Sequence, residues 1–111
     1  MVTSGDFDVR SETTRAGAAV LYVSGELDLA SAPQLAEALD ELVADPVVVD
    51  LSQCTFLDSA GMGVLLASAR TLSDSGRSLH VATSDPGILR VLEITAVDTL
   101  IAIHPDVESA L

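Results

Sequence analysis

The sequence predicts an α/β fold in which helices pack on a mixed β-sheet, with the element order β-β-α-β-α-β-α-β. Three observations predict it: short apolar segments typical of buried strands, apolar residues at helical spacing between them, and two early strands joined by a glycine-containing turn. Strand-helix-strand units imply parallel pairing with right-handed crossovers, whereas the leading hairpin makes the sheet mixed. The 111 residues suffice for one domain, spanning 1–111, that buries its own core.

The first two strands form the predicted hairpin. Residues 6–10 alternate polar and apolar side chains, as expected of a half-exposed edge strand. Residues 15–17 make the turn, and a longer strand follows over 18–23 and ends at Ser24-Gly25.

The first helix is predicted to begin at Ser31, because Ser31-Ala32-Pro33-Gln34 fits a capping box with proline in the first turn. Apolar side chains then recur at helical spacing and predict one buried stripe. The stripe consists of Leu35, Ala38, Leu39, Leu42 and Val43. Asp45-Pro46 ends the helix. Residues 47–51 are almost wholly apolar, as in a central strand that is covered on both faces.

A short turn is predicted after this strand, and then a second helix from residue 59 or 60 to residue 73. Cys54 is expected in the turn as a half-buried thiol, and as the single cysteine it excludes an internal disulfide. The buried stripe of the helix consists of Met62, Leu65, Leu66, Ala69 and Leu72. Asp74-Ser75-Gly76 supplies the stop. The remaining elements are a strand over 78–83, a helix from Asp85-Pro86 with Ile88, Leu89 and Leu92 facing inward, a strand over 100–103 and a helical fragment over 107–111.

The charge balance limits the classes of partner. Seventeen acidic residues face five arginines and no lysine, for a formal net charge of -12. Nucleic acids and anionic membrane surfaces are therefore not expected as partners, because both are bound through basic residues. The acidity either keeps an apolar domain in solution or complements a basic surface on a protein partner. No apolar run approaches the roughly 20 residues of a spanning helix, and the first residues lack a secretory signal, so a cytoplasmic protein is expected.

Ser59 is the residue for which the sequence predicts a chemical role. It follows Asp58 at the start of the second helix, which is the positive end of the helix dipole. Ser and Asp are favoured there as caps for unpaired backbone N–H groups, which is the ordinary interpretation. The alternative is that Asp58 caps the helix while the Ser59 hydroxyl points outward and carries a phosphate. The helix amides and dipole would tolerate that anion, so the fold should survive the modification.

Enzyme, metal and cofactor chemistry find little support. A receiver domain would need a lysine late in the chain, and the sequence has none; Asp50 is expected only to satisfy turn amides at the end of its strand. A serine hydrolase would need a Gly-x-Ser-x-Gly elbow and a histidine base for Ser59. His80, in mid-strand, is expected to be structural, and His104 to be a surface residue. A zinc site from Cys54, His80 and His104 lacks ligand spacing. We therefore predict no catalytic residue, metal or cofactor.

Two motifs about 30 residues apart resemble those of a known family. The first is Gly25-Glu26-Leu27-Asp28, followed by Ser31-Ala32-Pro33. The second is Val49-Asp50-Leu51-Ser52, followed by Phe56-Leu57-Asp58-Ser59-Ala60-Gly61-Met62-Gly63-Val64. With the order of elements, these motifs make the chain similar to the STAS domain, specifically to the bacterial anti-sigma factor antagonists, over roughly residues 6–108. Ala60 is a departure, since the family often has Ser or Thr at that position.

The resemblance implies a partner switch. In the family, the serine at the position of Ser59 is phosphorylated by a partner that is both a serine kinase and an anti-sigma factor, and a metal-dependent serine phosphatase resets it. The dephosphorylated form binds the anti-sigma factor and frees the sigma factor. The expected partner-binding residues are Asp28, Asp58, Ser59, Ala60, Gly61, Met62 and Gly63. The alternative is a STAS scaffold or regulatory subunit, in a stress-sensing assembly or a transport system, without kinase control.

Three of these residues also have a purely structural interpretation, which the sequence leaves open. Asp28 could cap or terminate a loop, although the resemblance places it near Ser59. Gly61 and Gly63 cost helix stability. Either the helix packs closely against the sheet, or a partner approaches the backbone beside Ser59.

Overall fold

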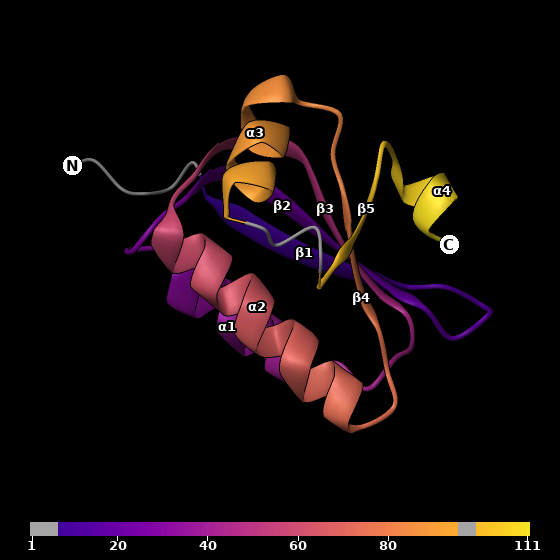
Figure 1. The fold of residues 1–111 in the computed structure, drawn as a ribbon. Helices are drawn as coiled ribbons and strands as arrows, with labels where there is room; N and C mark the ends of the chain where they lie inside the picture. The colour runs from indigo at the N-terminus through magenta and orange to yellow at the C-terminus, as the bar shows by residue number, and fades with distance from the viewer. Residues whose placement is uncertain (1–6, 96–99) are drawn as a thin grey trace.

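The computed structural model describes residues 7–95 and 100–111 and confirms the predicted α/β fold (Figure 1). Its elements follow the predicted order and include the short helix that was predicted over 107–111. In chain order they are β1 (Asp8–Thr13), β2 (Ala19–Leu27), α1 (Ala32–Asp40), β3 (Val47–Leu57), α2 (Ser59–Asp74), β4 (Leu79–Ala82), α3 (Pro86–Ile94), β5 (Ala102–His104) and α4 (Val107–Ala110). Asp6, in the predicted first strand, lies outside the described residues.

The five strands form one mixed sheet in the order β1-β2-β3-β4-β5. β1 and β2 are antiparallel, and the other neighbouring pairs are parallel. The predicted hairpin turn is present: Gly17 adopts a φ of 93°, which a residue with a side chain would rarely adopt. The Thr14 amide donates to the Ala18 carbonyl and closes the turn at 2.8 Å. The hairpin extends beyond the rest of the sheet in Figure 1.

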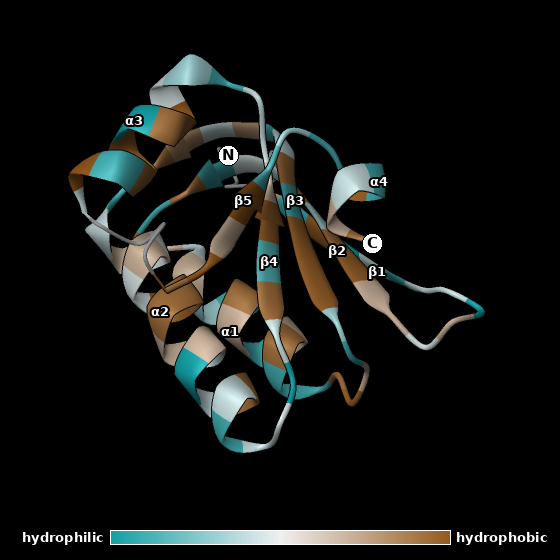
Figure 2. Ribbon diagram, turned by 45° about the vertical axis from the view of Figure 1, so that its right-hand side comes forward, coloured by the Kyte–Doolittle hydropathy of each residue, from teal (hydrophilic) through white to brown (hydrophobic). Residues whose placement is uncertain are grey.

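Helices cover the two faces of the sheet unequally. α1 and α2 lie side by side on one face and, with α3, enclose the main core, whereas α4 covers part of the other face (Figures 1 and 2). Alternate residues of β3 separate the two layers: Val47 and Val49 belong to the main core, and Val48 packs in the smaller cluster with Ala110 of α4. β3 is therefore a central strand covered on both faces, as predicted.

β3 is longer than predicted, and the expected turn after residue 51 is absent. Both β2 and β3 continue past an irregularity in their register, after which Ser24 lies opposite Gln53. The irregularity interrupts the alternation of inward and outward side chains that identifies a strand in a sequence. Cys54 consequently points into the core and is 3% exposed, so the prediction of a half-buried thiol in a turn was wrong. Burial raises the pKa of this thiol, whose Sγ donates to the Phe56 carbonyl.

Three predictions about α1 were wrong: its side-chain cap, its end at Asp45-Pro46 and one residue of its buried stripe. Ser31 makes no side-chain cap for the helix; its hydroxyl donates to the Glu26 carbonyl at 2.7 Å and accepts from the Asp28 amide at 2.9 Å. Val43, expected in the buried stripe, is 91% exposed because α1 ends at Asp40. The segment after the helix is instead held by Arg77, whose guanidinium donates to the Leu42 and Ala44 carbonyls.

The predicted end of α2 is confirmed in detail. Gly76 has a φ of 77°, its amide donates to the Ser73 carbonyl, and the Arg77 amide donates to the Leu72 carbonyl at 2.8 Å. This is the Schellman arrangement that a glycine after a helix favours. The later elements differ from the prediction by one or two residues at their ends, Leu89 is half-buried, and Leu100 is exposed before β5 begins.

Candidate functional site

The two sequence motifs meet where β2 and β3 end side by side. Leu27 lies opposite Leu57 in the parallel register, and the Asp58 amide donates to the Leu27 carbonyl at 3.2 Å. The next residues, Asp28 and Asp58, therefore leave the same edge of the sheet. This edge is the carboxyl end of the parallel strands, where α/β folds commonly place their functional residues.

Asp58 is the N-cap of α2, as the sequence predicted. Its backbone is extended, and its Oδ1 accepts hydrogen bonds from the amides of Ala60 at 2.9 Å and Gly61 at 3.1 Å. The Met62 amide donates to the Asp58 carbonyl and closes the first helical turn. The cap function is thus carried by the aspartate, which leaves the neighbouring serine without a capping role.

Ser59 is the first residue of α2, and its side chain is exposed. Within residues 7–95 and 100–111, its hydroxyl makes no hydrogen bond and has no basic side chain bonded to it. The prediction that Ser59 points outward beside a capping aspartate is confirmed. A hydroxyl in this position is accessible to another protein, and it lies at the positive end of a helix of 16 residues.

Asp28 holds the loop between β2 and α1. Its Oδ1 accepts from the amides of Ala30 and Ser31, at 3.0 and 3.1 Å, and from the Ser31 hydroxyl. The structural interpretation of Asp28 is therefore correct, and the residue also lies at the same edge as Asp58, as the resemblance implied. The turn leaves Leu29 78% exposed.

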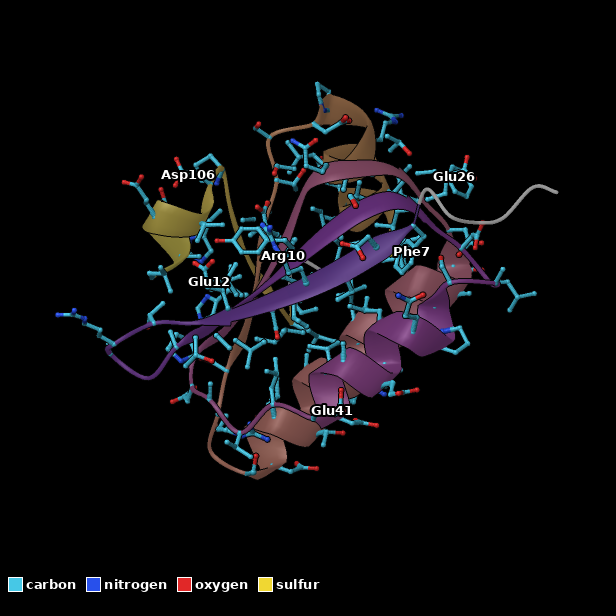
Figure 3. The ribbon with its side chains drawn as sticks, turned by 180° about the vertical axis from the view of Figure 1, so that it is seen from behind. Phe7, Arg10, Glu12, Glu26, Glu41 and Asp106 are labelled. Atoms are coloured by element: carbon cyan, nitrogen blue, oxygen red, sulfur yellow. The ribbon has the colours of Figure 1, made fainter. Side chains whose placement is uncertain are left out.

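Leu29 and Phe56 were missed by the sequence analysis. They are large apolar side chains at this edge, 78% and 48% exposed. Phe56 precedes the buried Leu57 in β3, and it lies opposite Glu26, which Figure 3 shows at this end of the sheet. No signal in the sequence identifies Phe56, because strand alternation would place it on the same face as Cys54, and the register irregularity that exposes it exists only between the paired strands. Exposed apolar residues next to a polar site are typical of surfaces that bind proteins.

Gly61 and Gly63 of α2 differ in the space that is available for a side chain. A Cβ atom on Gly61 would lie 2.7 Å from Leu27 Cγ and 2.8 Å from Leu57 Cδ1, so Gly61 lets the helix pack closely on the sheet. Gly63 has nothing within 4 Å of such an atom, and close packing therefore does not explain it. Gly63 and Ala60 instead line a shallow groove between α2 and α1. Gly61 and Met62 are buried beneath the surface that Ser59 and Gly63 expose.

The carboxyl edge is acidic beyond Asp28 and Asp58. Asp85 caps α3 by accepting from the amides of Gly87 and Ile88, and Asp106 caps α4 by accepting from the Ser109 amide. The hydrogen bonds from Ser109 lower the pKa of Asp106. Each parallel strand of the sheet is thus followed by an aspartate that accepts hydrogen bonds from the amides after it.

Asp50 and the three residues of the zinc site that the sequence disfavoured lie within strands, and not in the loops that carry Asp28 and Asp58. Asp50 is inside β3 and not at its end, so that part of the prediction was wrong, but its Oδ1 does accept from a neighbouring amide, that of Ser52, at 2.9 Å. Cys54 is buried in the main core, whereas His80 of β4 contacts His104 of β5, on the two strands farthest from β1. Among the described residues, no group of three or more His, Cys, Asp or Glu side chains could hold a metal ion.

No helix in the described parts of the chain has both the length and the apolar character needed to cross a membrane.

Comparison with known proteins gives the family. The family model described as "Mlab, STAS domain" matches residues 11–102. The chain is 44% identical over 62 residues to the anti-sigma-F factor antagonist RsfB of Mycobacterium tuberculosis; the match covers 53% of this chain and only about half, 51%, of that relative.

Two further relatives match over more of their length. The anti-sigma-B factor antagonist of Staphylococcus aureus is 28% identical over 89 residues, which is 78% of this chain and 82% of that protein. The crystal structure of an anti-sigma factor antagonist from Mycobacterium paratuberculosis superposes with a TM-score of 0.88 at 27% identity, covering 99% of this chain and 95% of that one. Since the family model spans most of the sequence and the fold agrees, this chain belongs to the STAS domain family.

Proposed function

We propose that this chain is an anti-sigma factor antagonist whose binding to an anti-sigma factor is switched off by phosphorylation of Ser59. The observation that carries the proposal is the exposed Ser59 hydroxyl at the first position of α2, next to an aspartate that already caps the helix. The names of the relatives from M. tuberculosis and S. aureus support the same role. The proposal entails a cytoplasmic location, because sigma factors act there.

In this proposal the chain is a substrate of its partner and not a catalyst. A serine hydroxyl is a weak nucleophile without an adjacent base, and within the described residues no base is hydrogen-bonded to Ser59. The anti-sigma factor would supply the base and ATP: Ser59 Oγ attacks the γ-phosphorus, the base takes the hydroxyl proton, and ADP leaves. A metal-dependent serine phosphatase would hydrolyse the phosphoserine and restore the hydroxyl.

The docking surface that we propose combines exposed and supporting residues. Asp28, Asp58, Ser59, Ala60 and Gly63 would face the partner, with Leu29 and Phe56 as apolar contacts. Gly61 and Met62 would act from beneath, by fixing the position of α2 on the sheet. Acidic and apolar groups together favour a partner surface that is basic around an apolar centre.

Electrostatics would make the switch effective. A phosphate adds about 1.5 to 2 negative charges, and it would stand beside Asp58 on a chain whose formal charge is already -12. The helix dipole reduces the cost of that charge in the free chain. In the complex the phosphate must be desolvated and accommodated sterically. A penalty of about 2.7 kcal/mol would suffice for a 100-fold loss of affinity.

Phosphorylation by the cognate anti-sigma factor tests the proposal. The chain is incubated with the kinase and ATP, and mass spectrometry locates the phosphate. We expect one phosphate on Ser59 and none on Ser59→Ala. Ser84→Ala is the control. Like Ser59, Ser84 is an exposed serine next to an aspartate that caps a helix, but it lies before that aspartate, Asp85, and not after it. Phosphate on another residue, with Ser59 unmodified, would reject the proposed site.

A further inference from the structure

The two histidines of the chain contact each other at the edge of the sheet farthest from β1. His80 lies in β4 and His104 in β5, opposite Ala102 and Ala82 respectively. His80 Nδ1 is 3.0 Å from His104 Nε2, and the ring centroids are 5.2 Å apart. Both side chains are half-buried, so His104 is not the surface residue that the sequence predicted. The pair forms a hydrogen bond in which one imidazole donates and the other accepts.

The histidine pair is surrounded by one hydroxyl, two acidic side chains and several apolar side chains. Ser78 Oγ lies 3.1 Å from His80 Nε2, on the far side of the ring. Asp45, from the segment before β3, is the acidic group that acts on His80, and Asp106, before α4, is the one near His104. β3 contributes the apolar Val48 opposite His80, and α4 contributes the apolar Val107 and Ala110 to the cluster on this face.

The elements that this contact ties to β4, namely β5 and the helix α4 after it, are short. β5 has three residues and α4 has four, and His104 directly precedes the loop that joins them. The Thr83 amide donates to the His104 carbonyl at 2.8 Å. Through Ala110, α4 covers Val20, Val48 and Ala82 on the second face of the sheet. Both elements are short, and the main core reaches β5 through Ile103, so one hydrogen bond between side chains can matter to their stability.

We propose that the His80–His104 pair is a proton-sensitive latch that holds β5 and α4 on the sheet. This proposal does not depend on the role of Ser59. The neutral pair shares one N–H between the two ring nitrogens, and a pair with one extra proton can still do so. When both rings are protonated, two N–H groups and two positive charges face each other across 3.0 Å. The rings must then separate, and β5 and α4 separate with them.

The direction of the pH effect follows from the position of His80. Burial, and then the positive charge of His104, lower the pKa of His80 below its ordinary value. A group whose folded pKa is lowered stabilises the fold above its unfolded pKa, about 6.5 for histidine. That stabilisation is lost as the pH falls through the folded pKa. The latch is therefore closed at neutral pH and opens on acidification.

Amide hydrogen exchange of the full chain, followed by NMR from about pH 7.5 to about pH 5, tests the latch. After correction for intrinsic exchange rates, protection of Thr83, β5 and α4 should fall as the pH drops below about 6.5, by at most tenfold per pH unit since one proton is taken up, and should level off below the folded pKa of His80. Protection in β2 and β3 should remain. Because the chain has two histidines and both are in the pair, no other side chain ordinarily titrates near pH 6.5.

The variant His104→Gln separates the latch from general acid sensitivity. A glutamine amide can donate to neutral His80 and can turn its oxygen toward protonated His80, without ionising itself. This variant should keep the protection at neutral pH, and the protection should fall less on acidification than in the wild type, because burial still lowers the pKa of His80 but the charge of His104 is gone. Protection of β5 and α4 that is unchanged across the pH range, or that falls equally in His104→Gln, would overturn the proposal. If the variant does not fold, the imidazole titrations of the wild type decide: two independent, ordinary pKa values contradict the latch.

Discussion

Alanine at Gly61 and at Gly63 should change the stability of the chain in opposite directions. Both glycines lie in the first turns of α2, so alanine adds helix propensity at each, by about 1 kcal/mol at most. The difference lies in the space around the added methyl group. At Gly61 it would lie 2.7 Å from Leu27 Cγ and 2.8 Å from Leu57 Cδ1, whereas at Gly63 nothing lies within 4 Å.

The steric cost at Gly61 should exceed the gain in propensity. Leu27 and Leu57 are 0% and 4% exposed, so neither side chain can move away without disturbing the core. Overpacking of this kind costs about 1–3 kcal/mol. After the propensity gain is subtracted, Gly61→Ala should lose up to about 2 kcal/mol of unfolding free energy. Gly63→Ala should gain about 0.5–1 kcal/mol.

Urea denaturation of the wild type and the two variants measures both effects, provided that the m values agree. The midpoint should decrease for Gly61→Ala and increase for Gly63→Ala. Equal midpoints for the two variants would refute the close packing of α2 on β2 and β3. Gly63→Ala then serves as a probe of docking, because any loss of its affinity for a partner cannot result from unfolding.

Three further predictions concern the same edge and the core beneath it. Asp58→Ala removes the acceptor for two amides of α2 and should lower the free energy of unfolding by about 1 kcal/mol in urea titrations, as loss of a cap does; an unchanged midpoint would exclude the cap. Cys54 is buried and its pKa is raised, so thiol reagents should modify it only as fast as the chain opens, and rapid modification of native protein would contradict its placement. Phe56→Ser should weaken partner binding in calorimetry by tenfold or more, about 1.4 kcal/mol, whereas Val43→Ser, at an exposed apolar residue after α1, should not; equal effects would remove Phe56 from the docking surface.

Local sequence signals were sufficient for α2 and for the hairpin. Asp58 caps α2 and Gly76 ends it through contacts within a few residues, which is the range over which a sequence motif acts. The two site motifs were also found, because each follows a strand that is recognisable from its apolar residues. Their meeting at one edge follows from parallel pairing, which puts the ends of β2 and β3 side by side.

The features that the sequence did not reveal depend on contacts between distant segments. Arg77 holds the carbonyls of Leu42 and Ala44, which are 33 to 35 residues away, and so excludes Val43 from the helix. The register irregularity that turns Cys54 inward exists only between two paired strands. The different surroundings of Gly61 and Gly63 are a matter of which side of α2 faces Leu27, and the hydrophobic pattern alone did not distinguish them.

The central claim is that a phosphate on Ser59 changes docking and leaves the fold intact, and one pair of measurements on the phosphorylated chain tests it. Thermal unfolding and calorimetric titration with the anti-sigma factor are compared for the phosphorylated and unphosphorylated forms. We predict melting temperatures within about 4 °C of each other, which corresponds to roughly 1 kcal/mol, and an affinity lower by roughly 100-fold. Unchanged affinity, or a phosphorylated chain that no longer folds, would contradict the account.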